Sequence, residues 1–345
     1  MVIKSMSDLS SIPLNGCKVV SLFSGCGGSS LGLSMAGYKV LSAVEFIPEA
    51  VKTYKTNFPN TYVYEVDIRD LKGQDILSRF NLKVGEVDLL EGSPPCSDFS
   101  KQRNKEGKEN RGKYKVYSDT KQRVDDLFYE YCRILSEIKP KVFLAENVEN
   151  LIYTDYYKKF IKSFEKQGYV VRSKVLNCED YGIPQSRKRL IFLGYREDIG
   201  FEPTFPKQIN KKVTTKDAIG DLVNSVPDME MTDLEKQYCK LIPIGSGINY
   251  LKMLRKKGIK IMLFNHRRDV WNKPHPTLVH NTRPIHQLKN RWLTVLEGKR
   301  LHGFPDDFVL TGTTNQQWER VGRAVPPLLY YIIGKHLYDN VFKFI

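Results

Sequence analysis

The stretch KVVSLFSGCGGSSLGLSMAGY, residues 18–38, joins a β-branched run to a helical segment through a glycine-rich turn. Five further apolar runs of strand length lie at residues 40–44, 63–66, 87–90, 141–145 and 189–195. A polar or glycine-rich cluster follows each of the first five runs, and one precedes the sixth. Strand-like runs that alternate with helical stretches predict βαβ units of a parallel sheet. Because the carboxyl ends of parallel strands share one edge, we expect these clusters to converge there.

The composition is that of a globular protein with an excess of positive charge. The 345 residues suit one large domain or two unequal ones, and 41% of them are hydrophobic. Lysine and arginine number 54 against 39 acidic residues, which gives a net charge of +15. This balance favours a polyanionic partner such as nucleic acid, although a solvated basic surface would give the same count.

Targeting signals and cysteine usage bear on the compartment. No apolar run approaches the roughly 20 residues of a membrane helix, and residues 1–16 lack the apolar core of a signal peptide. The six cysteines form no CxxC pair and show no metal-ligand spacing with the six histidines. We therefore expect a cytoplasmic protein with reduced thiols, no membrane association and no metal site.

Three features at the first strand ends predict an adenosine-containing cofactor. The turn Gly25-x-Gly27-Gly28 lets a backbone approach a ligand at a helix N-terminus, although it is not the GxGxxG fingerprint. Glu45 ends the next strand, where its carboxylate suits either a ribose diol or the dipole of the following helix. Asp67 ends the third strand and suits either an adenine amino group or the capping of a turn. The three together indicate such a cofactor more strongly than any one of them.

The segment EGSPPCSDFS, residues 91–100, places a cysteine after two prolines at the end of a strand. Both prolines fix φ at about −65°, and Gly92 leaves room for a close approach to the backbone. Cys96 is thus held on a stiff turn at the edge where open α/β sheets bind ligands. This decapeptide alone fits a reactive thiol and an inert one, and most lone cysteines are inert.

A second acid and a basic string follow later in the chain. Glu146, after four apolar residues, is either a protonatable group in a half-buried site or the N-cap of the next helix. Gln185, Arg187 and Arg189 alternate at period two, which puts all three on one face of a strand. Alternating arginines usually mark a solvated edge, but at a shared site they contact anions or carbonyl groups.

These motifs, in this order, resemble those of the cytosine-5 DNA methyltransferases from about residue 18 to the C-terminus. FSGCGG (23–28) is similar to the cofactor motif of the family, PPC (94–96) to its nucleophile motif and ENV (146–148) to its acid motif. QSRKR (185–189) is similar to the basic motif. RWLTVLEGKRLHGFPDDF (291–308) and VGRAVPPLL (321–329) resemble the two closing motifs. Six motifs in family order are very specific.

The resemblance implies a class I S-adenosylmethionine-dependent methyltransferase sheet, Rossmann-like, with a smaller target-recognition domain. The catalytic domain would comprise residues 1–199 and 286–345, and the target-recognition domain residues 200–285. The last helix would pack beside the cofactor turn. The implied partner is double-stranded DNA, which makes the protein nucleoid-associated, and the implied oligomeric state is a monomer. A restriction-modification setting is also implied, with a cognate restriction endonuclease as a candidate partner.

The resemblance also implies roles for individual residues. The implied catalytic residues are Cys96, Glu146, Arg187 and Arg189. The implied cofactor-binding residues are Phe23, Ser24, Gly25, Cys26, Gly27, Gly28, Glu45, Phe46, Asp67, Ile68, Pro94, Arg323 and Val325. Phe23 would stack on the adenine of S-adenosylmethionine, Glu45 would bind the ribose and Asp67 would bind the amino group of the adenine.

The chemistry explains why those residue types are needed. Cytosine C5 becomes nucleophilic when the Cys96 thiolate adds at C6. Glu146 at N3 and Arg189 at the base carbonyl would draw electrons from the ring. A stacked base is out of reach, so the cytosine must be flipped out of the duplex. Residues 101–126, rich in lysine and arginine, are interpreted as a lid over DNA, with a solvated loop as the alternative.

Two positions depart from the family pattern. Ser21 stands where an acid often precedes the cofactor motif, and Arg323 replaces an asparagine in GRAVPP. An arginine there would repel a sulfonium unless a carboxylate neutralises it, so we expect Arg323 to point away from the cofactor. A tRNA cytosine-5 methyltransferase of the same framework is the nearest alternative, but the chain lacks the Cys-Phe-Thr signature of that group. A Rossmann dehydrogenase would leave PPC, ENV and the arginines unexplained.

Overall fold

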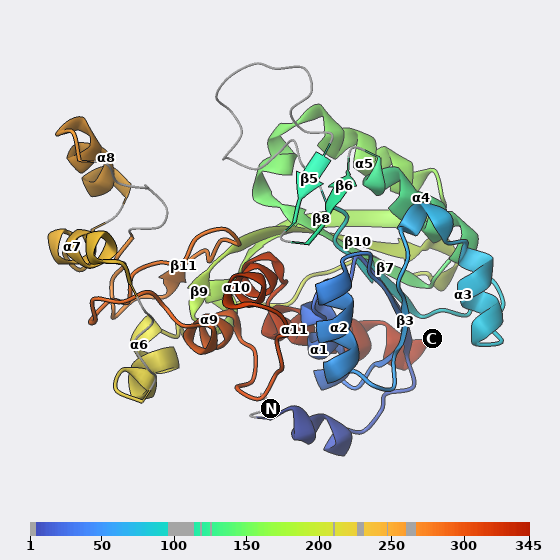
Figure 1. The fold of residues 1–345 in the computed structure, drawn as a ribbon. Helices are drawn as coiled ribbons and strands as arrows, with labels where there is room; N and C mark the ends of the chain where they lie inside the picture. The colour runs from blue at the N-terminus through green and yellow to red at the C-terminus, as the bar shows by residue number, and fades with distance from the viewer. Residues whose placement is uncertain are drawn as a thin grey trace.

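A seven-stranded sheet in the order β3-β2-β1-β4-β7-β10-β8 forms the centre of the protein (Figure 1). The computed structural model describes residues 5–95, 114–117, 119–124, 126–209, 211–225, 231–246, 248–259 and 267–345. The strands of the sheet are β1 (Lys18–Leu22), β2 (Lys39–Val44), β3 (Tyr62–Tyr64), β4 (Leu89–Gly92), β7 (Val142–Val148), β8 (Tyr169–Asn177) and β10 (Lys188–Arg196). All six runs expected to be strands are strands of this sheet.

The direction of β10 explains why its polar cluster precedes it. Strands β3, β2, β1, β4 and β7 pair in parallel. Strand β10 runs antiparallel to both of its neighbours, β7 and β8. The start of β10 therefore lies at the same edge of the sheet as the carboxyl ends of the parallel strands. Strand β8, at the edge of the sheet, was not predicted, because its alternating pattern YVVRSKVLN resembles no buried parallel strand.

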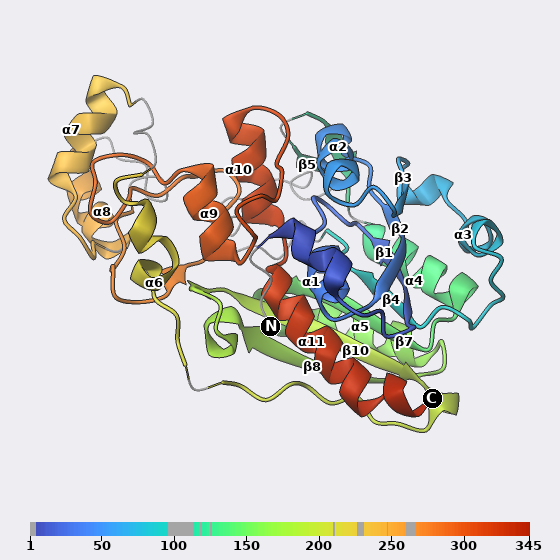
Figure 2. The ribbon, with the colours of Figure 1, turned by 90° about the horizontal axis from the view of Figure 1, so that it is seen from below.

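Helices cover both faces of the sheet (Figure 2). One face carries α1 (Gly28–Met35), α2 (Pro48–Asn57) and α11 (Pro327–Asn340), and the other carries α3 (Gly73–Arg79), α4 (Leu127–Ile138) and α5 (Asp155–Glu165). Successive strand residues point to opposite faces, so Val19 packs in the core beneath α11 and Val20 in the core beneath α4. The three layers confirm the predicted α/β class.

The glycine turn serves both the start of α1 and its packing. Gly27 has φ +93°, a left-handed conformation that favours glycine, and it caps the helix. A Cβ at Gly28 would lie 2.3 Å from the carbonyl oxygen of Val325. The closing segment before α11 can therefore press directly against the first turn of α1, as the resemblance implies.

A smaller lobe lies beyond the strand-end edge, on the side of the molecule away from β3 (Figure 1). It contains α6 (Thr215–Ile219), α7 (Asp233–Leu241), α8 (Ile248–Lys256) and β11 (His275–Pro276), which pairs with β9 (Gln185–Ser186). Its small core consists of Met231, Cys239, Ile242, Leu251, Leu254, Ile285 and Trp292. Trp292 belongs to this core although it follows the predicted boundary at residue 285.

Two further helices and a hairpin belong neither to the central sheet nor to the lobe. The helices are α9 (Val295–His302) and α10 (Thr314–Arg323), and the hairpin pairs β5 (Tyr114–Val116) with β6 (Lys121–Arg123). The 3₁₀ turns span Met6–Ser11, Ile68–Asp70, Glu149–Tyr153, Cys178–Tyr181, Glu197–Ile199, Gly220–Leu222 and Phe342–Phe344. Among the helices that the structure describes, none combines the length and the apolar character needed to cross a bilayer.

Candidate active site

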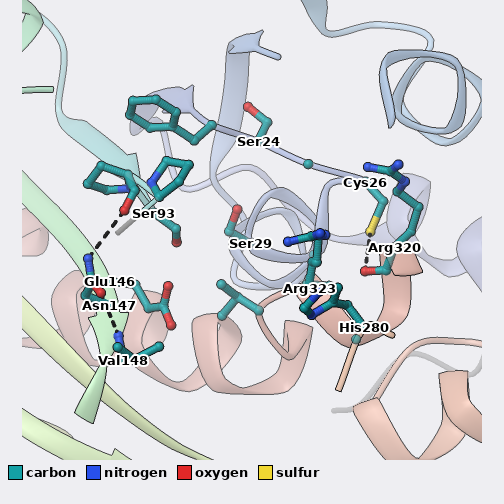
Figure 3. A pocket seen from close by; sticks show the side chains of 18 of the residues that line it. Ser24, Cys26, Ser29, Ser93, Glu146, Asn147, Val148, His280, Arg320 and Arg323 are labelled. Atoms are coloured by element: carbon teal, nitrogen blue, oxygen red, sulfur yellow. Dashed lines mark hydrogen bonds between the residues drawn. The ribbon is translucent and has the colours of Figure 1, made fainter. Parts of the chain in front are cut away.

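A cavity of about 960 Å³ opens where the strand ends meet α10 and the smaller lobe (Figure 3). Glu146, Asn147 and Val148 of β7 form one wall. Ser24 and Ser29, from the glycine turn and α1, lie across from them. Apart from Asp67, the clusters that were expected to converge at one edge therefore contribute to a single cavity.

Most of the predicted site residues line this cavity. The predicted residues in its wall are Phe23, Ser24, Gly25, Cys26, Gly28, Glu45, Phe46, Ile68, Pro94, Glu146, Arg187, Arg189, Arg323 and Val325. Gly27 and Asp67 are not in the wall. Cys96, together with most of the expected lid at 101–126, lies outside the described residues.

The turn after β4 brings the chain to the cavity. Ser93, Pro94 and Pro95 all line it, directly before Cys96 in the sequence. The amide nitrogen of Asn147 donates a hydrogen bond to the carbonyl oxygen of Pro94 at 3.3 Å. The acid motif on β7 thus anchors the backbone of the proline turn.

Glu146 is held by an arginine on the neighbouring strand. The Nε atom of Arg189 lies 2.7 Å from Oε1 of Glu146, and both side chains are largely buried. The next 3₁₀ turn has Val148 as its N-cap, so the N-capping alternative for Glu146 is wrong. A buried carboxyl beside an arginine can exchange hydrogen bonds with a planar heterocycle.

The two arginines of the basic string have different partners: Arg189 pairs with Glu146, whereas Arg187 binds backbone carbonyl groups. Arg187 is 2% exposed and donates to the carbonyl oxygens of Leu278, Gly322 and Ala324 at 3.0–3.2 Å. Burial, followed by the charge of Arg189, lowers the pKa of Arg187. Arg187 therefore ties the cavity wall together.

Gln185 does not share this site, although its period suggested one common face. Its amide nitrogen donates to the carbonyl oxygen of Leu301, and its amide oxygen accepts from the backbone of Leu278, both at 3.2 Å. Arg187 also binds the backbone of Leu278, so Gln185 and Arg187 point to the same side, with Gln185 behind the cavity wall.

The glycine turn and Glu45 fit an adenosine cofactor. The carboxylate of Glu45 accepts hydrogen bonds from the backbone of Gly25 at 2.7 Å and of Phe46 and Ile47 at 2.8 Å. Burial raises the pKa of Glu45 above its ordinary value. Phe23 has φ +55°, an uncommon conformation for a non-glycine residue that the tight turn imposes.

Asp67 shows the capping arrangement. Its carboxylate accepts from the backbone of Arg69 at 3.1 Å and pairs with the guanidinium of Arg69 at 2.8 Å. Gln122 donates to it at 3.0 Å. The structure thus places Asp67 behind the wall, while its neighbour Ile68 lines the cavity.

Arg323 lines the cavity, and its guanidinium is held by protein groups beside it. Its Nε atom lies 2.7 Å from Oε1 of Glu319, one helical turn earlier. The guanidinium carbon lies 4.6 Å from the ring centre of Tyr117, and Nη2 donates to the carbonyl oxygen of Val116 at 3.3 Å. Neutralisation by Glu319 removes the reason for the side chain to turn to solvent.

Several wall residues carry no sequence motif and were not predicted. Arg320 is 3% exposed and lies 3.4 Å from the carboxylate of Asp119. Residues 277–280, which include His280, also line the cavity. The available sequence signal for Arg320 was its position, one helical turn before Arg323 on α10. Residues 277–280, in contrast, reach the cavity only through the tertiary fold.

Sheet order, the reversed strand β10 and the glycine turn together define a Rossmann-like methyltransferase fold. A DNA methyltransferase described as encoded within a prophage (E. coli) superposes with a TM-score of 0.75 at 25% identity, covering 94% of this chain and 99% of that one. Spodoptera frugiperda DNMT2 shares the fold, with a TM-score of 0.63 at 17% identity, covering 95% of this chain and 100% of that one.

The chain belongs to the C-5 cytosine-specific DNA methylase family, whose model matches residues 17–339. Type II methyltransferase M1.HphI of Haemophilus parahaemolyticus is 32% identical, over 92% of this chain and 85% of the relative. Type II methyltransferase M.NgoPII of Neisseria gonorrhoeae is 30% identical, over 95% of this chain and 97% of the relative. The protein is therefore an enzyme of this family.

Proposed function

We propose that this protein methylates C5 of cytosine within a specific sequence of double-stranded DNA, using S-adenosylmethionine. The observation that carries the proposal is the position of Glu146 and Arg189 across one cavity from the glycine turn. The acid motif and the cofactor motif thereby face the same space. Family membership over residues 17–339 supports the same reaction.

The glycine turn and the neighbouring strand ends carry the residues that would hold the cofactor. Phe23 would stack on the adenine, Glu45 would bind the ribose, and the turn from Ser24 to Gly28 would accommodate the methionine part. The bound cofactor supplies an electrophilic methyl group. Asp67 would need to exchange its bonds with Arg69 to reach an adenine amino group, so we rank it below Ile68 among the cofactor contacts.

The protein groups would act on the cytosine ring. The thiolate of Cys96 adds to C6, which makes C5 nucleophilic. Glu146 hydrogen-bonds N3, and Arg189 both orients Glu146 and contacts the carbonyl oxygen. Arg187 positions this wall through three carbonyl groups. After methyl transfer, a base removes the C5 proton and the thiolate leaves.

The smaller lobe is the proposed target-recognition region. It lies beside the open cavity and carries exposed basic residues on α8. Sequence-specific modification of bacterial DNA would place the enzyme in the cytoplasm at the nucleoid, with a cognate restriction endonuclease as a partner of the system. The relatives named Type II methyltransferases support this setting, and the DNMT2 likeness at 17% identity supports the fold alone.

The decisive experiment offers labelled S-adenosylmethionine with duplex DNA or with tRNA. We expect label in DNA, and label in tRNA alone would overturn the proposal. Cys96→Ser should abolish transfer, because a serine hydroxyl does not ionise readily enough to attack C6. Duplex DNA with 5-fluorocytosine at the target should trap the wild type covalently. Substantial turnover by the serine variant would contradict the mechanism.

A further inference from the structure

A buried carboxylate lies beneath the glycine turn, and no step of the proposed reaction uses it. Glu91, near the end of β4, is 1% exposed. Its Oε1 atom accepts hydrogen bonds from the hydroxyl groups of Ser21 and of Ser29, the latter at 2.8 Å. A carboxylate this deeply buried, held by hydroxyl groups, is an expensive feature for a fold to retain.

The two serines connect Glu91 to the cavity. Ser29, in the first turn of α1, lines the cavity wall (Figure 3). The hydroxyl of Ser21 lies 2.8 Å from that of Ser24, which also lines the wall. Glu91 is therefore one hydroxyl group away from the space beside the glycine turn.

Strand register links Glu91 to the departure at position 21. Ser21 of β1 and Glu91 of β4 are direct partners in the parallel pair. A carboxylate on either residue would reach the same place beneath the turn, because partner side chains of adjacent strands lie side by side on one face. In this chain the acid thus lies on the neighbouring strand.

We propose that Glu91 provides the negative charge by which this pocket favours the cationic sulfonium cofactor over its neutral thioether product. The inference rests on the proposed function, since it takes S-adenosylmethionine as the cofactor. S-adenosylmethionine carries one more positive charge than S-adenosylhomocysteine, and the two otherwise present nearly the same surface. A buried carboxylate acts on this difference with little solvent screening.

In the described part of the chain, no basic side chain offsets the charge of Glu91, which leaves that charge for a bound cation to balance. Burial, with a smaller contribution from the charge of Glu146, raises the pKa of Glu91 to about 7, although the hydrogen bonds from Ser21 and Ser29 act in the opposite direction. The other titratable groups that it influences are the phenols of Tyr54 on α2, Tyr131 on α4 and Tyr330 on α11. A cation in the pocket favours the ionised carboxylate, so binding of S-adenosylmethionine should release a proton near neutral pH.

The test measures the affinity of the full-length protein for both molecules by calorimetry. In Glu91→Gln, which keeps the shape and a hydrogen-bond acceptor, we expect affinity for S-adenosylmethionine to fall roughly tenfold at pH 8. Affinity for S-adenosylhomocysteine should change less than about twofold. Wild-type preference for the cation should weaken from pH 8 to pH 6, and the variant should lack this dependence.

Asp88→Asn is the matched control, because Asp88 immediately precedes β4 at the opposite edge of the sheet. Its carboxylate pairs with Lys141 at 2.9 Å and accepts from the backbone of Lys18 at 2.7 Å. It should leave the ratio of the two affinities unchanged. If Glu91→Gln lost equal affinity for both molecules, Glu91 would have only a structural role, and the inference would be overturned.

A transplanted carboxylate provides an independent check. The double variant Ser21→Asp with Glu91→Ser restores an acid at the partner position, and it should recover most of the preference for S-adenosylmethionine. A folded double variant without that preference would contradict the inference. The proposed function fails separately, namely if the wild type binds neither molecule or methylates no DNA.

Discussion

At the residue scale, the buried acids of the site differ in what satisfies them. Glu45 has three backbone amides and Glu146 has the guanidinium of Arg189. Glu91 has two serine hydroxyls. Each acid is therefore disturbed by the loss of a different kind of partner.

Glu45→Ala should weaken binding of S-adenosylmethionine by about 1.5–3 kcal/mol, the worth of charge-assisted bonds to a diol. It should also lower the free energy of unfolding by about 1–3 kcal/mol, because three backbone amides lose their acceptor. Calorimetry and thermal unfolding measure the two effects. Glu65→Ala, which removes an exposed partner of Lys55, should change neither. Unchanged cofactor affinity in Glu45→Ala would remove Glu45 from the site.

Arg323→Asn should leave the affinity for S-adenosylmethionine unchanged or raise it, because a positive charge leaves the cavity wall. Thermal stability should fall by about 1 kcal/mol as the pair with Glu319 and the contact with Tyr117 are lost. Arg323→Lys keeps the charge and tests the contact with the ring alone. A large loss of cofactor affinity in the asparagine variant would identify Arg323 as a ligand.

Glu91 should make folding stability depend on pH in a defined direction. Because its pKa is raised from 4.5 to about 7 in the folded protein, the native state holds the proton more tightly. That stability is present below the unfolded pKa and is lost as pH rises through about 7. Relative to Glu91→Gln, the wild type should lose roughly 2–3 kcal/mol between pH 5 and pH 8. Urea unfolding of the wild type and of Glu91→Gln at both pH values measures this loss. An equal change in the free energy of unfolding of the two proteins would contradict the prediction.

At the element scale, close contact between α1 and the closing segment holds the cofactor turn. The carbonyl oxygen of Val325 occupies the space that a side chain at Gly28 would need. The reversed strand β10 matters equally, since it brings Arg187 and Arg189 to the edge occupied by the ends of β1, β4 and β7.

Gly28→Ala should therefore destabilise the protein by about 1–3 kcal/mol and weaken cofactor binding, because α1 must move away from the closing segment. Gly220→Ala is the control: a Cβ there would meet its nearest neighbour at an ordinary 3.7 Å. Thermal unfolding with and without S-adenosylmethionine measures both variants. Equal melting temperatures of Gly28→Ala and the wild type would show that the closing segment moves aside without loss of stability.

At the scale of the whole molecule, the net charge of +15 and the open cavity beside the smaller lobe suit a large anionic substrate. DNA affinity should fall by roughly 10³-fold or more between 50 and 200 mM salt if about six phosphates are contacted. Filter binding across a salt series measures the slope. A flat salt dependence would contradict a phosphate-based interface.

The exposed Arg255 and Lys256 on α8 should contribute to that slope. Replacing both with glutamine should reduce its magnitude by up to about 2 and leave cofactor affinity intact. The matched control replaces Lys335 and Lys343, exposed near the C-terminus, and should change neither quantity. Equal effects of the two double variants would remove α8 from the interface.

The sequence by itself determined which strands have candidate functional residues at their ends, and it determined the order of the motifs. These features are local: apolar runs, a glycine turn and paired prolines act through neighbouring residues. From them the α/β class and the family were predicted, and most of the predicted site residues line the cavity. Strand β8, the pairing of Ser21 with Glu91 and the partners of Arg323 were not.

Only the tertiary structure decided those features, because each depends on residues far apart in the chain. Glu91 meets Ser21 through strand register, and Arg323 meets Tyr117 because the hairpin packs beside α10. Gln185 lies behind the cavity wall, where the backbones of Leu301 and Leu278 are partners for its amide. A period in the sequence shows which way a side chain points, but the burial and the partners that set its charge and role arise from packing.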